Sequence, residues 1–288
     1  MTGIRASMDA SFLLTALFAA TFLGVAFWEA RRPLRPTVSP LTMRWFGNIT
    51  LFGLAWFIVW LLPFLSGYGA ALIAARRGWG LFNVISLPPM IALAASFVLL
   101  DFSAYWTHRL LHKIPLLWRL HALHHSDTDL DVTTAIRHHP AETLVQTFLD
   151  AAFAFAFGFP PEAIVLYAGV VLVIQTFSHG NVVLPPRLRW VNRWLITPDL
   201  HRLHHSLVYV ENNSNFGNLV PLWDRLFATL RLSPEGELKV GLPEFPGANF
   251  QRLDQLLIQP LHVATAPAPI RNVGGSSIGN HGSRMNQR

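Results

Sequence analysis

Histidine is the residue type whose number and spacing most clearly indicate chemistry in this sequence. The chain has 13 histidines in 288 residues, and eight of them lie in three short motifs. His108 and His112 belong to the first motif, HRLLH, and are four residues apart. On a helix this spacing places both imidazoles on one face, about one turn apart. The pair is therefore spaced to bind one metal ion together.

Two further motifs share the spacing HxxHH. They are HALHH, which contains His121, His124 and His125, and HRLHH, which contains His201, His204 and His205. The i, i+3 and i, i+4 relations put the three rings of each motif on one side of a helix. Because independent structural histidines have no reason to repeat this pattern, the three motifs predict a shared metal centre.

The ligand types limit the metals and the reactions. Imidazole is a suitable ligand for Fe, Zn, Cu and Ni, and eight imidazoles are enough for two ions. The chain has no cysteine, which excludes disulfides, thiolate-bound zinc and cysteine-bound iron–sulfur clusters. The zinc-protease motif HExxH is absent, because Arg109 and Leu110 occupy the inner positions of HRLLH. We interpret the pattern as a dinuclear, all-histidine site.

The composition is that of a membrane protein. Apolar residues make up 52% of the chain and charged residues 13%, against roughly 25% charged residues in a typical soluble domain. Residues 10–28, 45–75 and 78–100 contain no Asp, Glu, Lys or Arg. The formal net charge of +6 does not come from a dense basic block with interleaved aromatics, so nucleic-acid binding is not predicted.

The apolar segments predict an all-α integral membrane bundle of about four or five transmembrane helices, with a histidine-rich helical cap. Gly67 to Ser86 is less apolar and is expected to form an interfacial or re-entrant helix. A hairpin at about 143–178 is expected to turn at Gly158, Pro160 and Pro161. The expected spans are 10–28, 48–66 and 90–112, with hairpin arms at 143–159 and 162–178.

The positive-inside rule gives an orientation. Arg31, Arg32, Arg35 and Arg44 follow the first apolar segment, which places that loop in the cytoplasm. The histidine motifs then lie on the cytoplasmic face. We expect three regions: membrane helices and loops in 1–100, a catalytic domain in 101–240, and a C-terminal segment, 241–288, whose last part from about Val263 is a disordered tail.

Between about Asp101 and Leu230 the sequence resembles a known family. The resemblance rests on DFSAYWTHRLLH, on WRLHALHHSDTDLDVTTAIRHHPAE, on FSHGN, and on TPDLHRLHHS followed by ENNSNFGNLVPLWDRLFATL. The family is the membrane-bound fatty acid hydroxylase and sterol desaturase superfamily of non-haem di-iron enzymes. The resemblance implies two irons held by histidines, dioxygen as co-substrate, and hydroxylation or desaturation of a C–H bond of a lipid.

The family's eight-histidine signature matches the eight residues of the three motifs. His179 in FSHGN is implied as a ninth ligand, and Gln175, four residues before it, as a weaker ligand or a supporting group. His138 and His139 precede Pro140 and Glu142 in a stretch similar to the family's RxHPxE element, where hydrogen bonding or packing is the favoured role. His262 and His281 lie outside every motif.

A ligating imidazole needs an acceptor for its second N–H, which fixes the orientation of the ring. Asp101, Tyr105, His108 and His112 share one helical face by their spacing. Asn213, Asn215 and Gly217 match the family's asparagine-rich element and are expected to shape the turn beneath the metals. The acidic candidates for acceptors are Asp101, Asp127, Asp131, Glu142, Asp199 and Asp224, and for each a helix cap or an ion pair is an alternative role.

The implied reaction needs electrons, and the chain contains no GxGxxG fingerprint for a nicotinamide or flavin cofactor. A separate ferredoxin or cytochrome with its reductase is therefore expected, and Arg187, Arg189, Arg193 and Arg202 could dock it or contact lipid headgroups. The lipid is expected to reach the metals through an apolar channel between helices. Two alternatives remain at this point: a histidine-rich membrane transporter or sensor of metal ions, and an inactive scaffold of the same fold.

Overall fold

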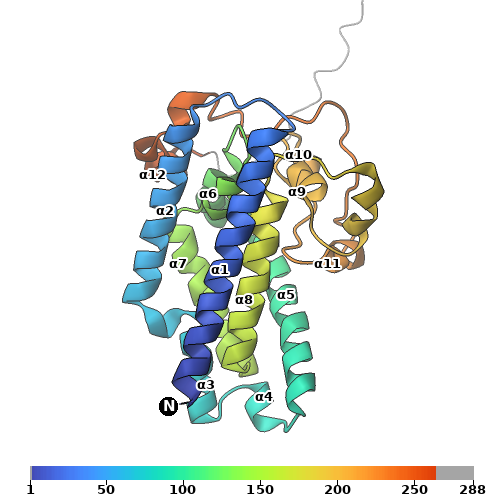
Figure 1. The fold of residues 1–288 in the computed structure, drawn as a ribbon. Coiled ribbons are helices and arrows are strands. Elements are labelled where there is room, and N and C mark those ends of the chain that lie inside the picture. The colour runs from blue at the N-terminus through green and yellow to red at the C-terminus, as the bar shows by residue number, and fades with distance from the viewer. Residues whose placement is uncertain (1, 264–288) are drawn as a thin grey trace, which may run out of the picture.

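The computed structural model describes residues 2–263, and the predicted tail from 264 onward lies outside this range. The described part is a bundle of long helices with a layer of short helices at one end (Figure 1). Within it the only paired extended backbone is an isolated antiparallel bridge between Ser206 and Val240. The predicted all-α bundle is confirmed.

Four helices are long and apolar enough to cross a membrane. They comprise Leu13–Arg31 of α1 (Thr2–Arg31), α2 (Leu41–Leu61), α5 (Pro89–Lys113) and α8 (Pro161–Ser178). The first hairpin arm, α7 (Pro140–Phe157), is not among the four and carries two acidic residues, Glu142 and Asp150. It packs within the bundle against α2, α3 and α5.

The segment after α2 differs from the expectation of one span at 48–66. The helix ends at Leu61, and Pro63–Leu65 forms a single 3₁₀ turn, η1, because Leu62 leaves the helical region and proline cannot donate a backbone hydrogen bond. The chain continues as α3 (Gly67–Arg77), whose N-cap Ser66 accepts from the amide of Gly69, and then as α4 (Leu81–Val84). The α7–α8 turn contains Gly158 at φ +63°, as expected for a glycine that ends a helix.

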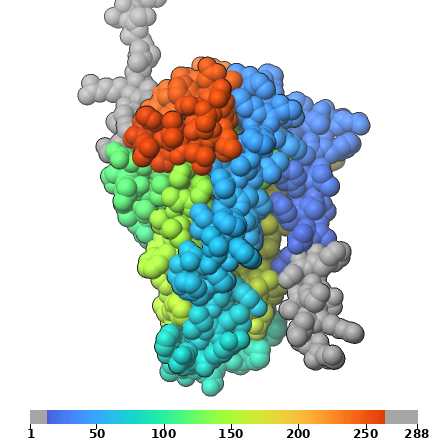
Figure 2. Space-filling view, turned by 90° about the vertical axis from the view of Figure 1, so that its left-hand side faces the viewer, coloured from blue at the N-terminus to red at the C-terminus, as the bar shows by residue number. Residues whose placement is uncertain are grey.

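The layer of short helices carries most of the histidine motifs, at the end of the bundle where α5 finishes (Figure 1). Its C-terminal helix α12 packs on α6 and covers the first residues of α2 (Figure 2). The elements of the layer are α6 (Pro115–His125), η2 (Val132–Ile136), η3 (Pro186–Arg193), α9 (Pro198–His204), α10 (Tyr209–Asn212), α11 (Leu222–Leu226), η4 (Ala248–Gln251) and α12 (Leu253–His262).

A buried ion pair joins this layer to the bundle. Arg44, in the first turn of α2, has no solvent exposure and donates through Nε and Nη2 to Asp127 and through Nη1 to Asp131. The shortest of these contacts are 2.7 Å to Asp131 and 2.8 Å to Asp127. Arg44 is therefore a structural cation rather than a solvated loop charge, which removes it from the positive-inside argument.

A second buried cation continues the network. Arg137, which follows η2, donates to the carbonyl of Leu123 at 3.0 Å, to the hydroxyl of Ser126 at 2.8 Å and to Asn48 of α2 at 3.2 Å. These bonds tie the end of the HALHH helix to α2. Two arginines thus hold this region, because Arg44 binds the loop that follows α6 and Arg137 binds the end of α6 itself.

Replacement of Arg44 should destabilise the whole protein. Arg44→Met leaves the buried Asp127 without its cation, and removing one partner of a buried pair costs about 3–5 kcal/mol. We expect a large fall in the melting temperature of the protein in detergent. Arg32→Met, a change at an exposed arginine of the neighbouring loop, is the matched control and should change stability by less than about 0.5 kcal/mol. Equal effects of the two changes would contradict the structural role.

Candidate metal centre

Nine histidines converge in two adjacent groups. The ligand-capable atoms within each group lie within 4.8 Å of one another, and all nine residues are buried. The first group, here called site A, contains His108, His112, His121, His125 and His204. The second, here called site B, contains His124, His179, His201 and His205.

The motif spacing explains how each motif contributes to the sites. Residues four apart lie nearly above one another on a helix, while a residue three apart is rotated to the side. His121 and His125 accordingly share site A, and His124 between them turns to site B. In HRLHH the assignment is reversed, because His201 and His205 share site B and His204 turns to site A. The HxxHH motifs therefore interlock the two sites, and the rings of His125 and His205 stack with centroids 4.4 Å apart.

Backbone carbonyls select the tautomer of four of these rings. A carbonyl oxygen can only accept, so the Nδ1 atom opposite it must carry the proton. Nδ1 of His108 lies 2.9 Å from the carbonyl of Phe216, and Nδ1 of His204 lies 2.7 Å from that of Ser214. In site B, Nδ1 of His124 and His179 lie 3.2 Å and 2.7 Å from the carbonyls of Arg137 and Gln175. These bonds leave Nε2 of each neutral ring with its lone pair directed inward.

The inward nitrogens have the arrangement that metal ions require. In site A the Nε2 atoms of all five rings are buried without a hydrogen-bond partner among the described residues. In site B the Nε2 atom of His179 lies 3.1 Å from that of His124 and 2.8 Å from that of His201. Lone pairs brought this close need a shared cation, and imidazole is a common ligand of iron and zinc. The residues present therefore fit a metal ion in each group.

Glu142 supports site A from the side. Its carboxylate accepts from Nδ1 of His121 at 2.8 Å, from Nδ1 of His138 at 3.0 Å and from the amide of Gln146 at 3.0 Å. A carboxylate on the outer nitrogen fixes the orientation of a ligating ring and makes it more basic. The His138 ring in turn stacks on His124 of site B at 4.6 Å. One buried carboxylate therefore orients rings at both sites.

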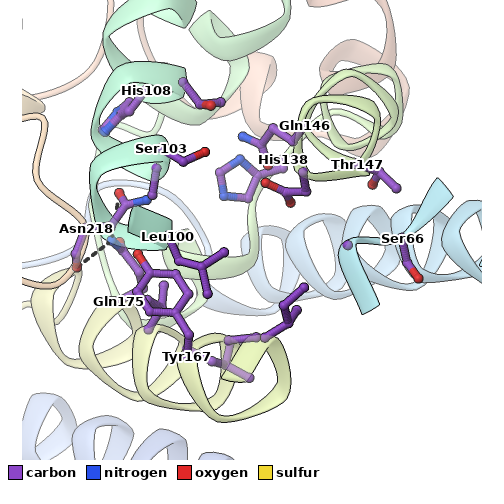
Figure 3. A pocket seen from close by; sticks show the side chains of 18 of the residues that line it. Ser66, Leu100, Ser103, His108, His138, Gln146, Thr147, Tyr167, Gln175 and Asn218 are labelled. Atoms are coloured by element: carbon purple, nitrogen blue, oxygen red, sulfur yellow. Dashed lines mark hydrogen bonds between the residues drawn. The ribbon is translucent and has the colours of Figure 1, made fainter. Parts of the chain in front are cut away.

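A cavity of about 700 Å³ reaches the two sites from the bundle. Its upper wall includes rings of both sites, and its lower wall includes Trp56, Val59 and Ile164 of the candidate spans. Figure 3 shows His138, Gln146 and Thr147 on one side of it, opposite Ser103 and Gln175. This is the arrangement that an apolar channel from the membrane to the metals requires.

Comparison with known proteins identifies the family of this region. The model of the family described as fatty acid hydroxylase matches residues 93–229, which include all nine histidines of sites A and B. The region 93–229 belongs to the fatty acid hydroxylase family. The resemblance found in the sequence motifs is confirmed.

Two curated relatives of this chain have names that refer to lipid substrates. The ornithine lipid hydroxylase OlsE of Rhizobium tropici is 34% identical over 147 residues, 51% of this chain and 44% of the relative. The alkylglycerol monooxygenase of Xenopus tropicalis is 31% identical over 174 residues, 58% of this chain and 37% of the relative. The chain thus spans less than half the length of these two relatives. No solved structure matches it. Family membership and the four apolar helices make it an integral membrane protein.

Several residues predicted to support the metal centre contact other groups instead of its histidines. Asp101 accepts from Tyr167 at 3.1 Å and from Trp223 at 2.8 Å, instead of from a histidine. The hydroxyl of Tyr105 pairs with Thr229 at 2.9 Å and its ring packs beside Phe216. Both residues brace the helix that carries His108, because they join α5 to α8, α11 and the turn that follows α11.

Asp224 and Asn215 act through the backbone. Asp224 accepts from the amides of Phe216 and Gly217 at 2.8 and 2.9 Å, and so holds the carbonyl that faces His108. Asn215 adopts φ +53° and donates to the carbonyl of Leu200 at 2.9 Å. Asn215 thus shapes the turn next to the metal-binding helix, as the family's asparagine-rich element implies.

The remaining predicted residues are a cavity-lining residue, a helix cap and two partners of a buried arginine. The side chain of Gln175 lines the cavity and donates to Asn218, while its backbone carbonyl faces His179. His139 is only the N-cap of α7 and lies outside both sites, with Nε2 3.3 Å from the carbonyl of Leu257. Asp127 and Asp131, proposed as acceptors, instead bind Arg44.

The carbonyl acceptors and Asn212 were not predicted from the sequence. The side-chain amide of Asn212 lies 3.0 Å from Nδ1 of His125 and 3.1 Å from the carbonyl of His204. Carbonyls have no side-chain signature, so no motif could have revealed them. Asn212 stands in the ENNSN element, which was interpreted only as a turn.

Burial controls the protonation of the histidines. Desolvation, followed by the effect of neighbouring rings, lowers the pKa of His124, His125, His201 and His205 well below the usual range. Burial also lowers the pKa of His179 and of His204 to about 3. His138 differs, because Glu142 raises its pKa against the effect of burial. Six rings of the two sites are therefore neutral and able to bind metal near pH 7, namely those of His124, His125, His179, His201, His204 and His205.

Metal content should separate the two sites. We expect the wild-type protein, purified anaerobically, to carry two ions, and His108→Ala in site A and His201→Ala in site B each to lose one of them, because each change removes a ligand from one group only. Elemental mass spectrometry measures the content. His262→Ala, at an exposed position that ends α12, is the matched control and should keep both ions. Full retention of metal by the site A and site B variants would contradict the assignment.

The metal-free protein should lose stability as the pH falls. The buried rings stay neutral when folded, whereas unfolded histidines take up protons below about pH 6.5, so the unfolded state binds more protons and is favoured. We expect the melting temperature of chelator-treated protein in detergent to fall as the pH is lowered from 7.5 to 5. A melting temperature that stays constant over this range would show that the rings are not buried as neutral groups.

Proposed function

We propose that this protein is a membrane-bound non-haem di-iron oxygenase that hydroxylates or desaturates a C–H bond of a lipid with dioxygen. The observation that carries the proposal is the cavity, since it joins the two histidine groups to residues of the apolar helices. The names of the relatives, a hydroxylase of ornithine lipids and a monooxygenase of alkylglycerols, support a lipid as substrate.

Sites A and B would each hold one iron through the Nε2 atoms of their histidines. When bound and reduced, the irons would supply activation of dioxygen for attack on an unreactive C–H bond. His108, His121, His124, His179 and His201 also line the cavity, so a lipid chain within it would lie directly beside the ligands.

The protein's own residues prepare the site for this chemistry. The carbonyls of Phe216, Ser214 and Gln175 hold the protons on Nδ1 and keep the inner nitrogens basic. Leu111, Val171 and Leu172 line the cavity with apolar side chains, which exclude water from the reacting carbon. Apolar contacts hold the part of the chain beside the rings, because the bond to be attacked offers no polar group.

Electrons would come from a separate ferredoxin or cytochrome. Arg187, Arg189 and Arg193 are exposed on and beside η3 at the metal end of the molecule, together with the exposed Trp190 and Trp194. This surface could dock an acidic donor. Arg202, which was assigned to it from the sequence, is buried and donates to the carbonyls of Gly180 and Val182. We place the metal end on the cytoplasmic face, where such donors and the exposed Arg31 and Arg32 would lie.

Lipid profiling of cells tests the function. We expect a lipid that gains one oxygen atom or loses two hydrogen atoms when the wild type is expressed with oxygen, and no change without oxygen or with His124→Ala/His204→Ala, which removes one ligand from each site. Mass spectrometry of total lipid extracts detects the change, and expression of His262→Ala should reproduce the wild-type profile. An unchanged lipidome when a reductase and its electron carrier are co-expressed would overturn the proposal.

A further inference from the structure

A carboxylate without a protein partner lines the cavity at the depth of the membrane helices. Asp150 on α7 is an exposed residue of the cavity lining and has no hydrogen bond or ion pair with any residue of the described range 2–263. It is eight residues from Glu142 and eight from the Gly158 turn, which at 1.5 Å per residue is about 12 Å along the helix from each. Asp150 therefore lies midway between the metal centre and the far end of the bundle.

Three polar side chains that line the cavity together with Asp150 already have partners. Thr147 donates to the carbonyl of Thr143 at 2.7 Å, Tyr167 donates to Asp101 and Ser66 donates to the carbonyl of Pro63 at 2.6 Å. An ionisable side chain in an apolar membrane environment is costly unless it acquires a partner. No donor among the described residues meets Asp150, and because its side chain lines the cavity, a molecule that enters the cavity can supply the partner.

The break between α2 and α3 lies at the same level. Non-helical backbone at membrane depth is tolerated where it is buried in protein or lines a cavity, and Ser66, Gly67 and Tyr68, which follow the break, line this cavity. Gly67 is packed against the carboxylate residue, since a Cβ atom added there would lie 3.4 Å from Cβ of Asp150. The segment after the break thus forms part of the cavity wall beside Asp150.

We propose that Asp150 is a substrate-binding residue that accepts a hydrogen bond from a hydroxyl or other donor group of the lipid. This inference rests on the proposed function and deepens it by naming the substrate class: a lipid with a single chain in the cavity and a donor group on that chain. The donor at Asp150 would set which carbon lies beside the histidines, about 12 Å away. An unsubstituted hydrocarbon chain has no such donor and would bind in no fixed register.

Binding of two probes of equal length tests the inference without turnover. Radiolabelled 1-dodecanol and dodecane are titrated onto the full-length, metal-containing protein in nanodiscs, without reductant, and binding to empty nanodiscs is subtracted. The measured quantity is the preference for the alcohol, the ratio of the two dissociation constants. We expect Asp150→Leu to lower this preference about 10- to 100-fold, the effect of one hydrogen bond to a charged group. The two probes partition differently into lipid, but this difference is the same for every variant, so it cancels when the ratio is compared between variants.

Two further variants complete the design. Asp150→Asn keeps the size and one acceptor oxygen and should keep part of the preference. Phe148→Leu, on the outward side of the same helix and largely exposed, should leave it unchanged. Metal content and melting temperature verify that each variant is folded. An alcohol preference that is the same in the wild type and Asp150→Leu overturns the inference, even if the lipidome shows oxygenation. A lost preference in Asp150→Leu supports it, even if no oxidised lipid is found.

Discussion

The structure depends on bringing nine buried imidazoles together with nitrogen atoms facing inward. In four of the rings the carbonyl opposite Nδ1 decides which nitrogen is left to bind metal. Without cations the converging nitrogens repel one another, so the fold around them has to be rigid before metal arrives. Much of the remaining architecture can be understood as providing that rigidity.

Rigidity comes from polar groups that are themselves buried and paired. Arg44 of α2 binds Asp127 in the loop after α6, and Arg137 binds Asn48 of α2, while Asp224 and Asn215 hold the turn that faces His108 and α9. The bonds of the two arginines join segments far apart in the chain. Buried networks of this kind specify one arrangement because a half-formed network leaves charges unpaired in an apolar environment. The metal end therefore resembles the polar interior of a soluble protein placed on apolar helices.

The cavity connects this polar end to the membrane. It has rings of both metal sites at one end and residues of three candidate spans along its length. The break after α2 and the less apolar α7 would both be unfavourable on a lipid-facing surface, and both border the cavity. A route for a lipid chain that never leaves the apolar environment accounts for these features together, in agreement with relatives that are named for lipid substrates.

The sequence by itself determined the helical membrane class, because long uncharged segments can bury their backbone in lipid only as helices. It also determined the histidine set, because chelating spacing on a helix is local. Which histidines are grouped together was decided by the tertiary structure, since the sideways offset of His124 and His204 within their motifs matters only when α5, α6, α8 and α9 meet. The partners of Arg44 and Asp101, the carbonyl acceptors and the position of Asp150 at the cavity were likewise settled by packing. Arg44 and Asp101 lie far from their partners in the chain, and no local pattern encodes these contacts.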